Sequence, residues 1–591
     1  MLRIFKNFRK QEVVLALFSV VFVVAQVWLE LKLPDYMREI TSLITTQDSA
    51  MHDILIAGGK MLLCAFGSLL VTVLVAVCAS RIASNFSAIV RGKLFDKVQS
   101  FSMEEIGRFS TASLITRSTN DVTQVQMLIV MGLSIMLRAP IMAGGGGFVM
   151  AILKIVDKSW QWTLSTGVAV VVLLIVVIIC VSLCMPKFKR LQSLTDDINQ
   201  VTRENLTGLN VVRAYNAEAY QEEKFEKVNK DLTDTHWFTS KTMAFMMPTI
   251  MMIMNGLSLA IYWIGAVLIN DAQDMQGKFT LFSDMVVFSS YAMQVVMSFM
   301  MLVMIFIMLP RASVAAKRIL EVLDTEPSIE DGTRDTFPVM KDGEVEFKDV
   351  SFKYPDAEEY VLEHISFSAK KGETIAFIGA TGCGKSTAIN LIPRFYDATE
   401  GEVFVDGVNV KEYTQEALHN KIGYVSQKAI LFSGTIADNV AYGENGKAPA
   451  TQDDIAMAVK VAQASEFVEK KDQGYDGYVA QGGSNFSGGQ KQRLSIARAI
   501  ARQPEILIFD DSFSALDYKT DRILREALRK ECKDATKIIV AQRIGTIRDA
   551  DKIIVLDDGQ IAGMGTHDEL MKNCEVYQEI AYSQLSKEEL A

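Results

Sequence analysis

The feature that most constrains this chain is a series of long apolar segments, all of them within residues 1–310. A helix needs about 20 mostly apolar residues to cross the hydrocarbon core of a bilayer. The segments that reach this length cover residues 13–33, 54–79, 127–153, 162–183, 243–269 and 281–309. Because lipid offers the backbone no hydrogen-bond partner, each of them is expected to be a helix. The sequence therefore predicts a membrane domain of six helices over residues 1–310.

Composition and charge narrow the class of protein further. Of the 591 residues, 50% are hydrophobic and 22% are charged, which is too apolar for an ordinary soluble chain of this length. The formal net charge of −10 disfavours nucleic acid as a partner, since phosphate backbones are bound by an excess of basic residues. The seven cysteines are spaced neither as a disulfide framework nor as a zinc site. We therefore expect a membrane protein with no nucleic-acid partner.

The charges beside the apolar segments predict the orientation of the chain. Basic residues cluster before the first segment and after the second, and they are Arg3, Lys6, Arg9, Lys10, Arg81, Arg91, Lys93 and Lys97. Residues 34–53, between these two segments, hold one arginine and four acids. Because loops rich in lysine and arginine stay in the cytoplasm, the N-terminus is predicted to be cytoplasmic. Six crossings return the chain to the cytoplasm, so we expect a multi-pass protein of the plasma membrane.

Two polar stretches between the apolar segments are too long to be simple loops. They cover residues 80–126 and 185–242, and both are rich in helix formers. Long helices are therefore expected to project into the cytoplasm. Each projection is predicted to hold a turn that touches a cytoplasmic domain, one near residues 110–120 and the other near residues 204–214.

The character of the chain changes after the last apolar segment. A charged linker is predicted over residues 311–338, followed by a soluble domain over residues 339–591. Alternating apolar residues predict its first strands at residues 345–352 and 364–369. The predicted fold class is thus a membrane α-helical domain of six spans with long cytoplasmic extensions, followed by an α/β domain.

A glycine-rich run in the α/β domain carries the first chemical signal. Residues 379–386 read Gly-Ala-Thr-Gly-Cys-Gly-Lys-Ser, which fits the pattern G-x-x-x-x-G-K-[ST] between an apolar strand and an apolar-periodic stretch. In that setting backbone N–H groups surround a phosphate chain, the lysine adds a positive charge and the serine hydroxyl binds Mg2+. The pattern predicts a nucleoside-triphosphate site, whose binding residues are expected to be Thr381, Gly382, Cys383, Gly384, Lys385, Ser386 and Thr387.

Two further motifs follow the phosphate loop. Residues 506–510 form an apolar run that ends in Asp510, whose carboxylate is expected beside the Mg2+ held through Ser386. Residues 486–490 read Phe-Ser-Gly-Gly-Gln and precede a helical stretch over residues 491–501. This pentapeptide predicts a second anion site, which faces away from the chain's own phosphate loop.

Together these residues resemble the ATP-binding cassette family, and six spans before one cassette resemble a half-transporter of the exporter type. The resemblance implies that two cassettes enclose two ATP molecules, with the phosphate loop of one subunit facing the signature pentapeptide of the other. It identifies Tyr354 as the aromatic that stacks on adenine and Gln427 as the glutamine that senses Mg2+ and the γ-phosphate. The implied cofactors are ATP and Mg2+, the latter held by Ser386, Gln427 and Asp510. The signature contacts carried over from the family are Ser487, Gly489 and Gln490.

Two positions depart from the family pattern. The family places a glutamate after the Mg2+ aspartate to polarise the attacking water, whereas this chain has Asp511, which is one methylene shorter. Where the family has a switch histidine, this chain has Gln542, which can donate to the γ-phosphate but cannot carry a charge. With Gln427 these are the expected catalytic residues. We interpret the chain as the degenerate-site subunit of a heterodimeric bacterial multidrug exporter, an ABC-type ATPase that is slow or inactive at its own site.

The spans themselves indicate the cargo. Residues 243–269 and 281–309 are rich in methionine, a flexible side chain that suits either a surface for many apolar molecules or ordinary helix packing. The aromatic residues nearby, with Asn255 and Gln294 as isolated polar groups, favour a cavity for many drug-like molecules. Arg138 lies within the third span, so it is expected to face the interior, toward a structural partner or a substrate.

The predicted function is efflux of amphipathic or hydrophobic compounds by alternating access. The expected partners are a second half-transporter, membrane lipids and this cargo. Flipping of a lipid or a lipid-linked precursor is the alternative. A regulatory or channel-like pseudo-ATPase subunit, which binds ATP as a structural ligand, is an alternative of another class.

Overall fold

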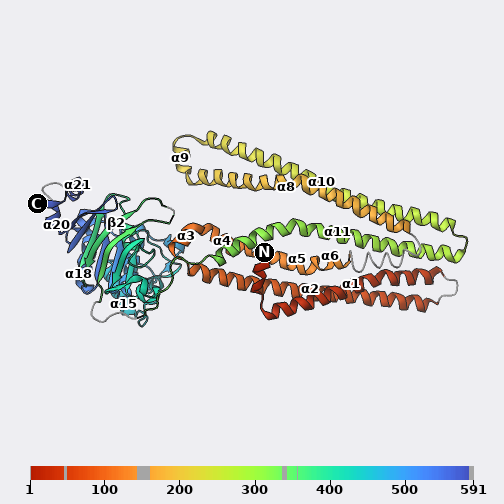
Figure 1. The fold of residues 1–591 in the computed structure, drawn as a ribbon, viewed down its shortest axis with the longest axis horizontal. Helices are drawn as coiled ribbons and strands as arrows, with labels where there is room; N and C mark the ends of the chain where they lie inside the picture. The colour runs from red at the N-terminus through yellow and green to blue at the C-terminus, as the bar shows by residue number, and fades with distance from the viewer. Residues whose placement is uncertain (1, 46–49, 143–159, 336–341, 356, 585–591) are drawn as a thin grey trace. The chain divides into compact units, whose positions relative to one another are not determined.

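The computed structural model describes residues 2–45, 50–142, 160–335, 342–355 and 357–584. By its internal contacts the chain divides into two compact units. The helical unit consists of Met1–Gln99 and Thr111–Thr325, and the α/β unit consists of Ser100–Ser110 and Glu326–Ala591. Figure 1 shows the long helices of the first unit and the strands of the second.

Long helices make up the helical unit. The described helices before residue 325 are η1 (Leu2–Asn7), α1 (Lys10–Thr45), α2 (Met51–Gln99), α3 (Met103–Phe109), α4 (Thr111–Thr116), η2 (Arg117–Asp121), α5 (Val122–Met131), η3 (Gly132–Met136), α6 (Arg138–Pro140), α8 (Trp160–Thr207), α9 (Leu209–Ala214), α10 (Glu218–Asp271) and α11 (Met275–Asp324). Among the described residues, 6 helical stretches are long and apolar enough to cross a membrane, and each overlaps one predicted span. The prediction of six membrane helices is confirmed. The last part of the third predicted span, residues 143–153, lies outside the described residues.

The polar stretches between the spans are helical, as predicted. α2 continues to Gln99 and α8 to Thr207, well past the apolar part of each helix. Beyond α8 the chain turns through α9, and Asn216 at φ 49° takes the left-handed conformation that lets the chain reverse before α10. The turn predicted near residues 204–214 is therefore present, and it belongs to the helical unit.

α8 and α10 pack side by side along their length (Figure 1). Trp162, at the start of α8, is 1% exposed, and its indole Nε1 donates to the Ile261 carbonyl of α10 at 3.1 Å. Its ring also stacks on Phe288 of α11, with 5.6 Å between the centroids. Because a buried indole N–H needs an acceptor, this contact fixes the register between α8 and α10.

The observed end of α11 corrects the predicted start of the linker. The sequence predicts a linker from residue 311, but α11 runs unbroken to Asp324. The residues buried on this part of α11 recur at the spacing of one helix face, and they are Ala312, Ala315, Ala316, Ile319 and Val322. Charged residues between them give the segment a linker-like composition although one of its faces is packed.

The first predicted turn is also displaced. It is expected near residues 110–120, but the segment that joins the α/β unit is Ser100–Ser110, and the residues that follow continue the helical unit. The Glu105 carboxylate anchors this segment by accepting the Ser102 N–H at 2.8 Å and the Ser328 N–H at 2.9 Å. Burial raises the pKa of Glu105, but the hydrogen bonds from Ser102 and Ser328 outweigh it, so the pKa falls below its ordinary value.

Two sheets form the core of the α/β unit. A 4-stranded antiparallel sheet has the order β2-β1-β4-β5, and a 6-stranded sheet has the order β12-β11-β3-β10-β9-β6. The strands are β1 (Val345–Phe352), β2 (Leu362–Ala369), β3 (Thr374–Gly379), β4 (Glu400–Val405), β5 (Val408–Asn409), β6 (Ile422–Val425), β9 (Ile506–Asp510), β10 (Thr536–Val540), β11 (Lys552–Asp557) and β12 (Gln560–Gly565). β1 confirms the strand predicted at residues 345–352, and β2 contains the one predicted at residues 364–369.

The helices of the α/β unit follow these strands closely. They include α12 (Lys385–Asn390), α17 (Gly488–Ala501), α18 (Tyr518–Glu531), α19 (Ile544–Ile547), α20 (His567–Asn573) and α21 (Glu575–Gln584). Strands β3, β6, β9, β10 and β11 run parallel to one another in the larger sheet, and the edge strand β12 pairs antiparallel with β11. Val540 at the end of β10 pairs with Asp510 at the end of β9, so the loops that follow these strands meet at one edge. Ligands bind at such an edge in parallel sheets, and the predicted site residues lie there.

Candidate functional site

The phosphate loop lies between β3 and α12. Lys385 is only 9% exposed, and its Nζ donates to the carbonyls of Gly379 at 3.0 Å and Ala380 at 2.6 Å. Among the described residues no carboxylate is bonded to this ammonium, so its charge is available to a polyphosphate. Thr381 and Gly382 are exposed, and nothing lies within 4 Å of a Cβ built on Gly382. The loop is therefore open on one face, as a phosphate cradle requires.

Gly384 and Cys383 form the inner part of the loop. Gly384 has φ +94°, and a Cβ there would lie 2.6 Å from Leu362 Cδ2, so only glycine fits. Cys383 is 5% exposed and packs in the core beneath the loop. The loop geometry thus follows from the residues of the motif together with the strand β2 beneath it.

Ser386 and Asp510 meet beside the loop. The Ser386 hydroxyl donates to Asp510 Oδ1 at 2.6 Å, and Asp510 is 6% exposed. Burial raises the pKa of Asp510, while the hydrogen bond from Ser386 acts in the opposite direction. A hydroxyl and a carboxylate so close together offer two hard oxygen ligands, which fits Mg2+.

Tyr354 is partly committed to packing. Its ring makes edge-on contacts with Phe352 at 5.0 Å and Tyr396 at 5.4 Å between centroids. Its hydroxyl lies 3.1 Å from Thr387 Oγ1, so two of the predicted binding residues touch each other. The residue is half-buried, and the exposed part of its ring remains for a nucleobase.

Asp511 lies at the centre of a second group of site residues, together with Gln427 and Gln542. Its Oδ2 accepts the Gln542 Nε2 at 2.9 Å and the Gln427 Nε2 at 3.4 Å. The three predicted catalytic residues are thus brought together. Asp511 has φ 46°, a conformation uncommon outside glycine, and is 8% exposed. Burial raises its pKa, and hydrogen bonds from Gln427 and Ser514 oppose the rise.

This arrangement limits the chemistry of Asp511. A general base needs a lone pair aimed at the proton it removes, and here one carboxylate oxygen already accepts two amide N–H groups. Gln542 offers a donor to a phosphate oxygen but no imidazole that could share a proton. Both amide hydrogen bonds fall on Oδ2 of the Asp511 carboxylate.

The signature residues sit at the start of α17. Ser487 is the N-cap, and its hydroxyl accepts the Gln490 N–H at 3.3 Å while Gln490 Oε1 accepts the Ser487 N–H at 3.0 Å. A Cβ on Gly489 would lie 3.2 Å from the Ala515 carbonyl, which favours glycine there. Ser487 is exposed, and among the described residues no hydrogen bond joins the signature to the phosphate loop of the same chain. Sequence reasoning expected this separation.

In the helical unit, Arg138 has a partner that sequence reasoning missed. Its guanidinium donates to Glu30 Oε1 at 2.9 Å and to Oε2 at 2.7 Å. Gln26 and Ser68 also donate to Glu30, at 3.1 Å and 3.4 Å. The expectation that Arg138 faces the interior is confirmed. The missed signal was a lone glutamate inside the first predicted span, since charges in spans usually occur in pairs.

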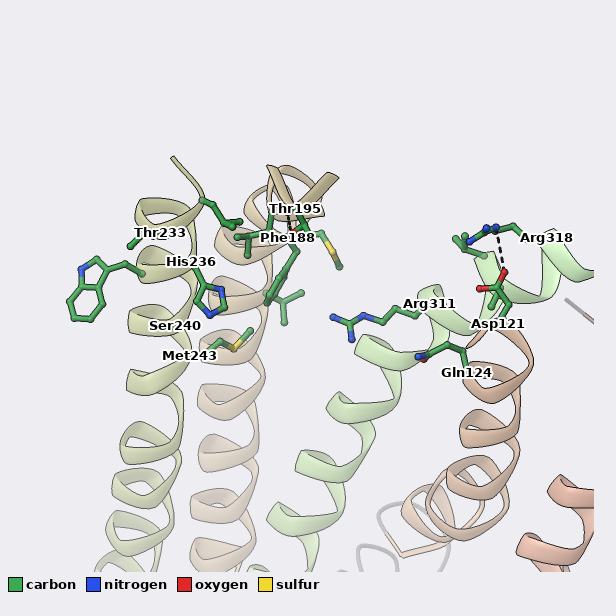
Figure 2. Close-up of a pocket in the computed structure, with 17 residues that line it drawn as sticks. Asp121, Gln124, Phe188, Thr195, Thr233, His236, Ser240, Met243, Arg311 and Arg318 are labelled. Atoms are coloured by element: carbon green, nitrogen blue, oxygen red, sulfur yellow. Dashed lines mark hydrogen bonds and ion pairs between the residues drawn. The ribbon is translucent and has the colours of Figure 1, made fainter. Parts of the chain in front are cut away.

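A pocket of about 1300 Å³ opens between α8 and α10 on one side and α11 on the other. Figure 2 shows Arg311 of α11 pointing toward the side where His236 and Met243 of α10 lie. The pair of Arg318 and Asp121, 3.4 Å apart, lies at its other side. The remaining wall is mostly apolar, with Val181, Met185, Phe188, Leu191, Leu232, Trp237, Val314 and Ala315.

Only some residues of the predicted methionine surface line this pocket. Met243 lines it, but Met254 and Met285 are buried in the packing core of α8, α10 and α11. Met251 and Met252 are largely exposed on α10. Most of these methionines therefore pack helices or cover the outside of the unit, which favours the plainer of the two interpretations.

Comparison with known proteins gives the family. Residues 16–316 match the family model of the ABC transporter transmembrane region, and residues 362–514 match the family model described as ABC transporter. An uncharacterized ABC transporter ATP-binding protein of Mycobacterium tuberculosis is 41% identical over 89% of this chain and 87% of its own length. An ATP-dependent lipid A-core flippase of Haemophilus influenzae is 32% identical over 86% of this chain and 84% of its own length.

A solved structure shares the fold. A bacterial Atm1-family ABC exporter with ATP bound superposes with a TM-score of 0.78 over 97% of both chains, at 24% identity. The chain carries one membrane region and one ATPase region, which is the architecture of a half-transporter and implies a second subunit. The protein therefore belongs to the ABC transporter family, as an exporter-type half-transporter whose ATPase domain couples ATP hydrolysis to transport.

Proposed function

We propose that this chain is the catalytically weak subunit of a heterodimeric exporter, with its N-terminus and α/β unit in the cytoplasm. The pairing of Asp511 with Gln542 carries the proposal, because it ties up the carboxylate at the base position. Lys385, Ser386 and Asp510 keep the geometry that suits ATP and Mg2+. The site is thus equipped to bind ATP and poorly equipped to hydrolyse it.

Each side of the site has a separate task in this proposal. Lys385 and the loop N–H groups hold the phosphates, Tyr354 holds the base, and Ser386, Asp510 and Gln427 hold Mg2+. The free energy for transport comes from ATP bound at the two sites of the dimer. The exposed signature of this chain completes the partner's active site, through Ser487, Gly489 and Gln490.

The test compares this chain alone with its complex. The full-length chain is purified alone and co-expressed with the product of the neighbouring open reading frame as the candidate partner, and ATP hydrolysis is measured for both. We expect activity only in the complex. Neutralising the partner's catalytic glutamate should abolish that activity, whereas Asp511→Asn should leave it within about twofold, because Asp511 is not the working base. Fast hydrolysis by the lone chain, lost in Asp511→Asn, would overturn the proposal.

For the cargo we propose amphipathic compounds that enter the pocket of the helical unit. The wall is mostly apolar and the few polar groups are cationic or neutral, apart from Asp121, which is paired with Arg318. Apolar walls with a few placed polar groups are typical of sites for small amphipathic molecules. This observation favours efflux of such compounds over a purely regulatory role.

A matched pair of variants tests the pocket. Val314→Glu adds a charge to the apolar wall, where Val314 is 60% exposed. Phe95→Glu adds the same charge to α2 at a residue that is 65% exposed and does not line the pocket. We expect dye efflux from cells to fall several-fold in the first variant only. Equal efflux in both would show that cargo passes elsewhere.

Lipid flipping is the second candidate, favoured by one observation. Within the described part of the chain no carboxylate pairs with Arg311, so a cation lies beside the apolar wall of the pocket. A lipid with an anionic headgroup has this same combination of apolar and charged parts. Translocation of a fluorescent anionic lipid in proteoliposomes, without efflux of dyes, would favour this function.

A further inference from the structure

The C-terminal helix α21 touches the segment that carries Gln542. We call residues 541–544 the switch segment. Gln584, at the end of α21, donates from Nε2 to the Gln542 carbonyl at 2.7 Å and accepts the Ile544 N–H on Oε1 at 2.9 Å. One side-chain amide therefore holds the backbone on both sides of Arg543.

This contact supplies a cap that α19 otherwise lacks. The first N–H groups of a helix have no partner within it, and a short polar side chain at the N-cap usually accepts one of them. The N-cap of α19 is Arg543, whose side chain makes no capping hydrogen bond. Gln584 accepts the Ile544 N–H instead, from 40 positions further along the chain. The start of α19 therefore depends on α21.

α21 is a firm support for this contact. Tyr577 and Ala581 are 0% exposed, and the Tyr577 hydroxyl lies 2.8 Å from His567 Nδ1 of α20. Gln584 itself is exposed, so its position follows from its two hydrogen bonds and not from burial. The helix is thus fixed by packing, and its last side chain reaches the switch segment.

The switch segment in turn reaches the catalytic side of the site. Gln542 Nε2 donates to Asp511 Oδ2 at 2.9 Å. The Arg543 guanidinium donates to the carbonyls of Ser514 at 3.3 Å and Leu516 at 3.4 Å, in the loop that follows Asp511. A displacement of the backbone at residue 542 therefore moves the amide that faces Asp511. Misplacement by about 1 Å is enough to weaken a contact with a reacting group.

We propose that Gln584 is a positioning residue that fixes the Gln542 amide for contact with the terminal phosphate of a nucleoside triphosphate. The inference rests on the role proposed above for Gln542. It adds that the C-terminal helix adjusts how this site distinguishes a triphosphate from a diphosphate. Because a diphosphate lacks the γ-phosphate, loss of Gln584 should weaken binding of ATP and leave binding of ADP unchanged.

The test uses the full-length chain in nanodiscs with Mg2+. Gln584→Ala should raise the dissociation constant for ATP about three- to tenfold, the effect of one or two hydrogen bonds, with the constant for ADP unchanged. Hydrogen exchange of the Ile544 amide should become faster. Gln584→Glu keeps the acceptor for Ile544 but loses the donor to Gln542, so exchange should stay slow while ATP affinity falls.

The matched control lies on the same helix. Gln578 donates to the Met571 carbonyl at 3.0 Å, in α20, and Gln578→Ala should change neither exchange of Ile544 nor nucleotide affinity. Unchanged exchange in Gln584→Ala would overturn the capping contact. Faster exchange with equal losses of ATP and ADP affinity, or with no loss, would overturn the positioning role.

Gln542→Ala separates this inference from the role on which it rests. If Gln542→Ala weakens ATP binding and Gln584→Ala does not, only the positioning role of Gln584 is wrong. If neither variant weakens ATP binding, the role of Gln542 at the γ-phosphate is wrong as well.

Discussion

The two sides of the nucleotide site are built differently. On the phosphate side, Lys385 donates to backbone carbonyls and Ser386 donates to Asp510, so among the described residues no carboxylate competes with a phosphate for the Lys385 ammonium. The other side holds Asp511, and we call it the water side because the attacking water would lie there. Asp511 Oδ2 accepts hydrogen bonds from Gln542 and Gln427, so this oxygen of the carboxylate is already engaged. In the function proposed above, affinity for ATP and the capacity to hydrolyse it therefore depend on separate groups of residues.

The largest expected effect comes from repairing the water side. Asp511→Glu combined with Gln542→His should raise ATP hydrolysis by the lone full-length chain about 100-fold, because a positioned general base is worth at least that factor. Hydrolysis is measured in nanodiscs at saturating ATP. The same pair of changes should leave ATP affinity nearly unaltered, since the phosphate side is untouched.

Single variants control this prediction. Gln542→His alone adds an imidazole beside a carboxylate that is still too short, so it should gain little. If the double variant hydrolyses ATP as slowly as the natural chain, the limiting defect is not on the water side and the contrast between the two sides fails.

The next effect comes from breaking the phosphate side. Lys385→Ala should weaken ATP binding by the full-length chain about tenfold to a hundredfold, which is the worth of a hydrogen bond to a charged group. The fold should survive, because within the described residues Lys385 bonds only to carbonyls of its own loop and to Cys383. Fluorescent ATP binding is the measurement.

Lys371→Ala is the control for Lys385→Ala. Lys371 is exposed and lies 3.7 Å from Asp342, away from the phosphate loop. The Lys371→Ala variant should bind ATP as tightly as the natural chain does. If Lys385→Ala and Lys371→Ala bind ATP equally tightly, Lys385 does not bind the phosphates.

A smaller effect is expected from the ion pair of the helical unit. Arg138→Ala leaves the Glu30 carboxylate without its cation inside the membrane, and should cost about 1 to 2 kcal/mol of stability once partial exposure is allowed for. Transport selectivity or coupling across several dyes should change with it. Thermal unfolding in detergent and dye efflux are the measurements.

The paired variant decides between structure and transport. Arg138→Met with Glu30→Gln removes both charges and should restore stability. If dye efflux is restored too, the pair is structural. If stability returns and efflux does not, Arg138 acts on cargo. Unchanged efflux in Arg138→Ala itself would remove any transport role.

The regions that could be predicted from sequence are those whose information is local. The phosphate loop is eight consecutive residues, and its strand, turn and helix follow from glycine conformation and residue type. The six spans follow from length and apolarity. Asp511 and Gln542 stand out as well, because each sits at a fixed place relative to a motif.

Features that depend on contacts between distant residues were missed. Glu30 and Arg138 are 108 positions apart, and Gln584 and Gln542 are 42 apart, so no periodicity links them. The linker was predicted to start too early, at residue 311, because composition averages the packed face and the charged face of the last turns of α11. The segment that joins the α/β unit was predicted near residues 110–120 instead of 100–110 for a similar reason. Glu105 has a polar side chain, yet it is only 4% exposed because it accepts hydrogen bonds from backbone N–H groups.

The smallest expected effect is a change in Tm that comes from the charge of Asp511. The direction of this change follows from the burial of the carboxylate. The pKa of Asp511 is raised in the folded chain, so its ionised form destabilises the fold at neutral pH. Asp511→Asn should therefore raise the Tm at pH 7. The gain should shrink as the pH falls through the folded pKa, because the natural carboxyl is then neutral too.

Asp517 is the control with the opposite sign. Its pKa is lowered by hydrogen bonds with Thr520, so its ionised form stabilises the fold above the unfolded pKa and this contribution is lost on acidification. Asp517→Asn should lower the Tm slightly at pH 7, and the difference should vanish at low pH. If instead Asp511→Asn lowers the Tm at pH 7, the Asp511 carboxylate is stabilised by Gln542 and Gln427 more than burial costs it. The water side would then be a tightly held acceptor, and Gln542 would leave it for a phosphate only at a loss of affinity.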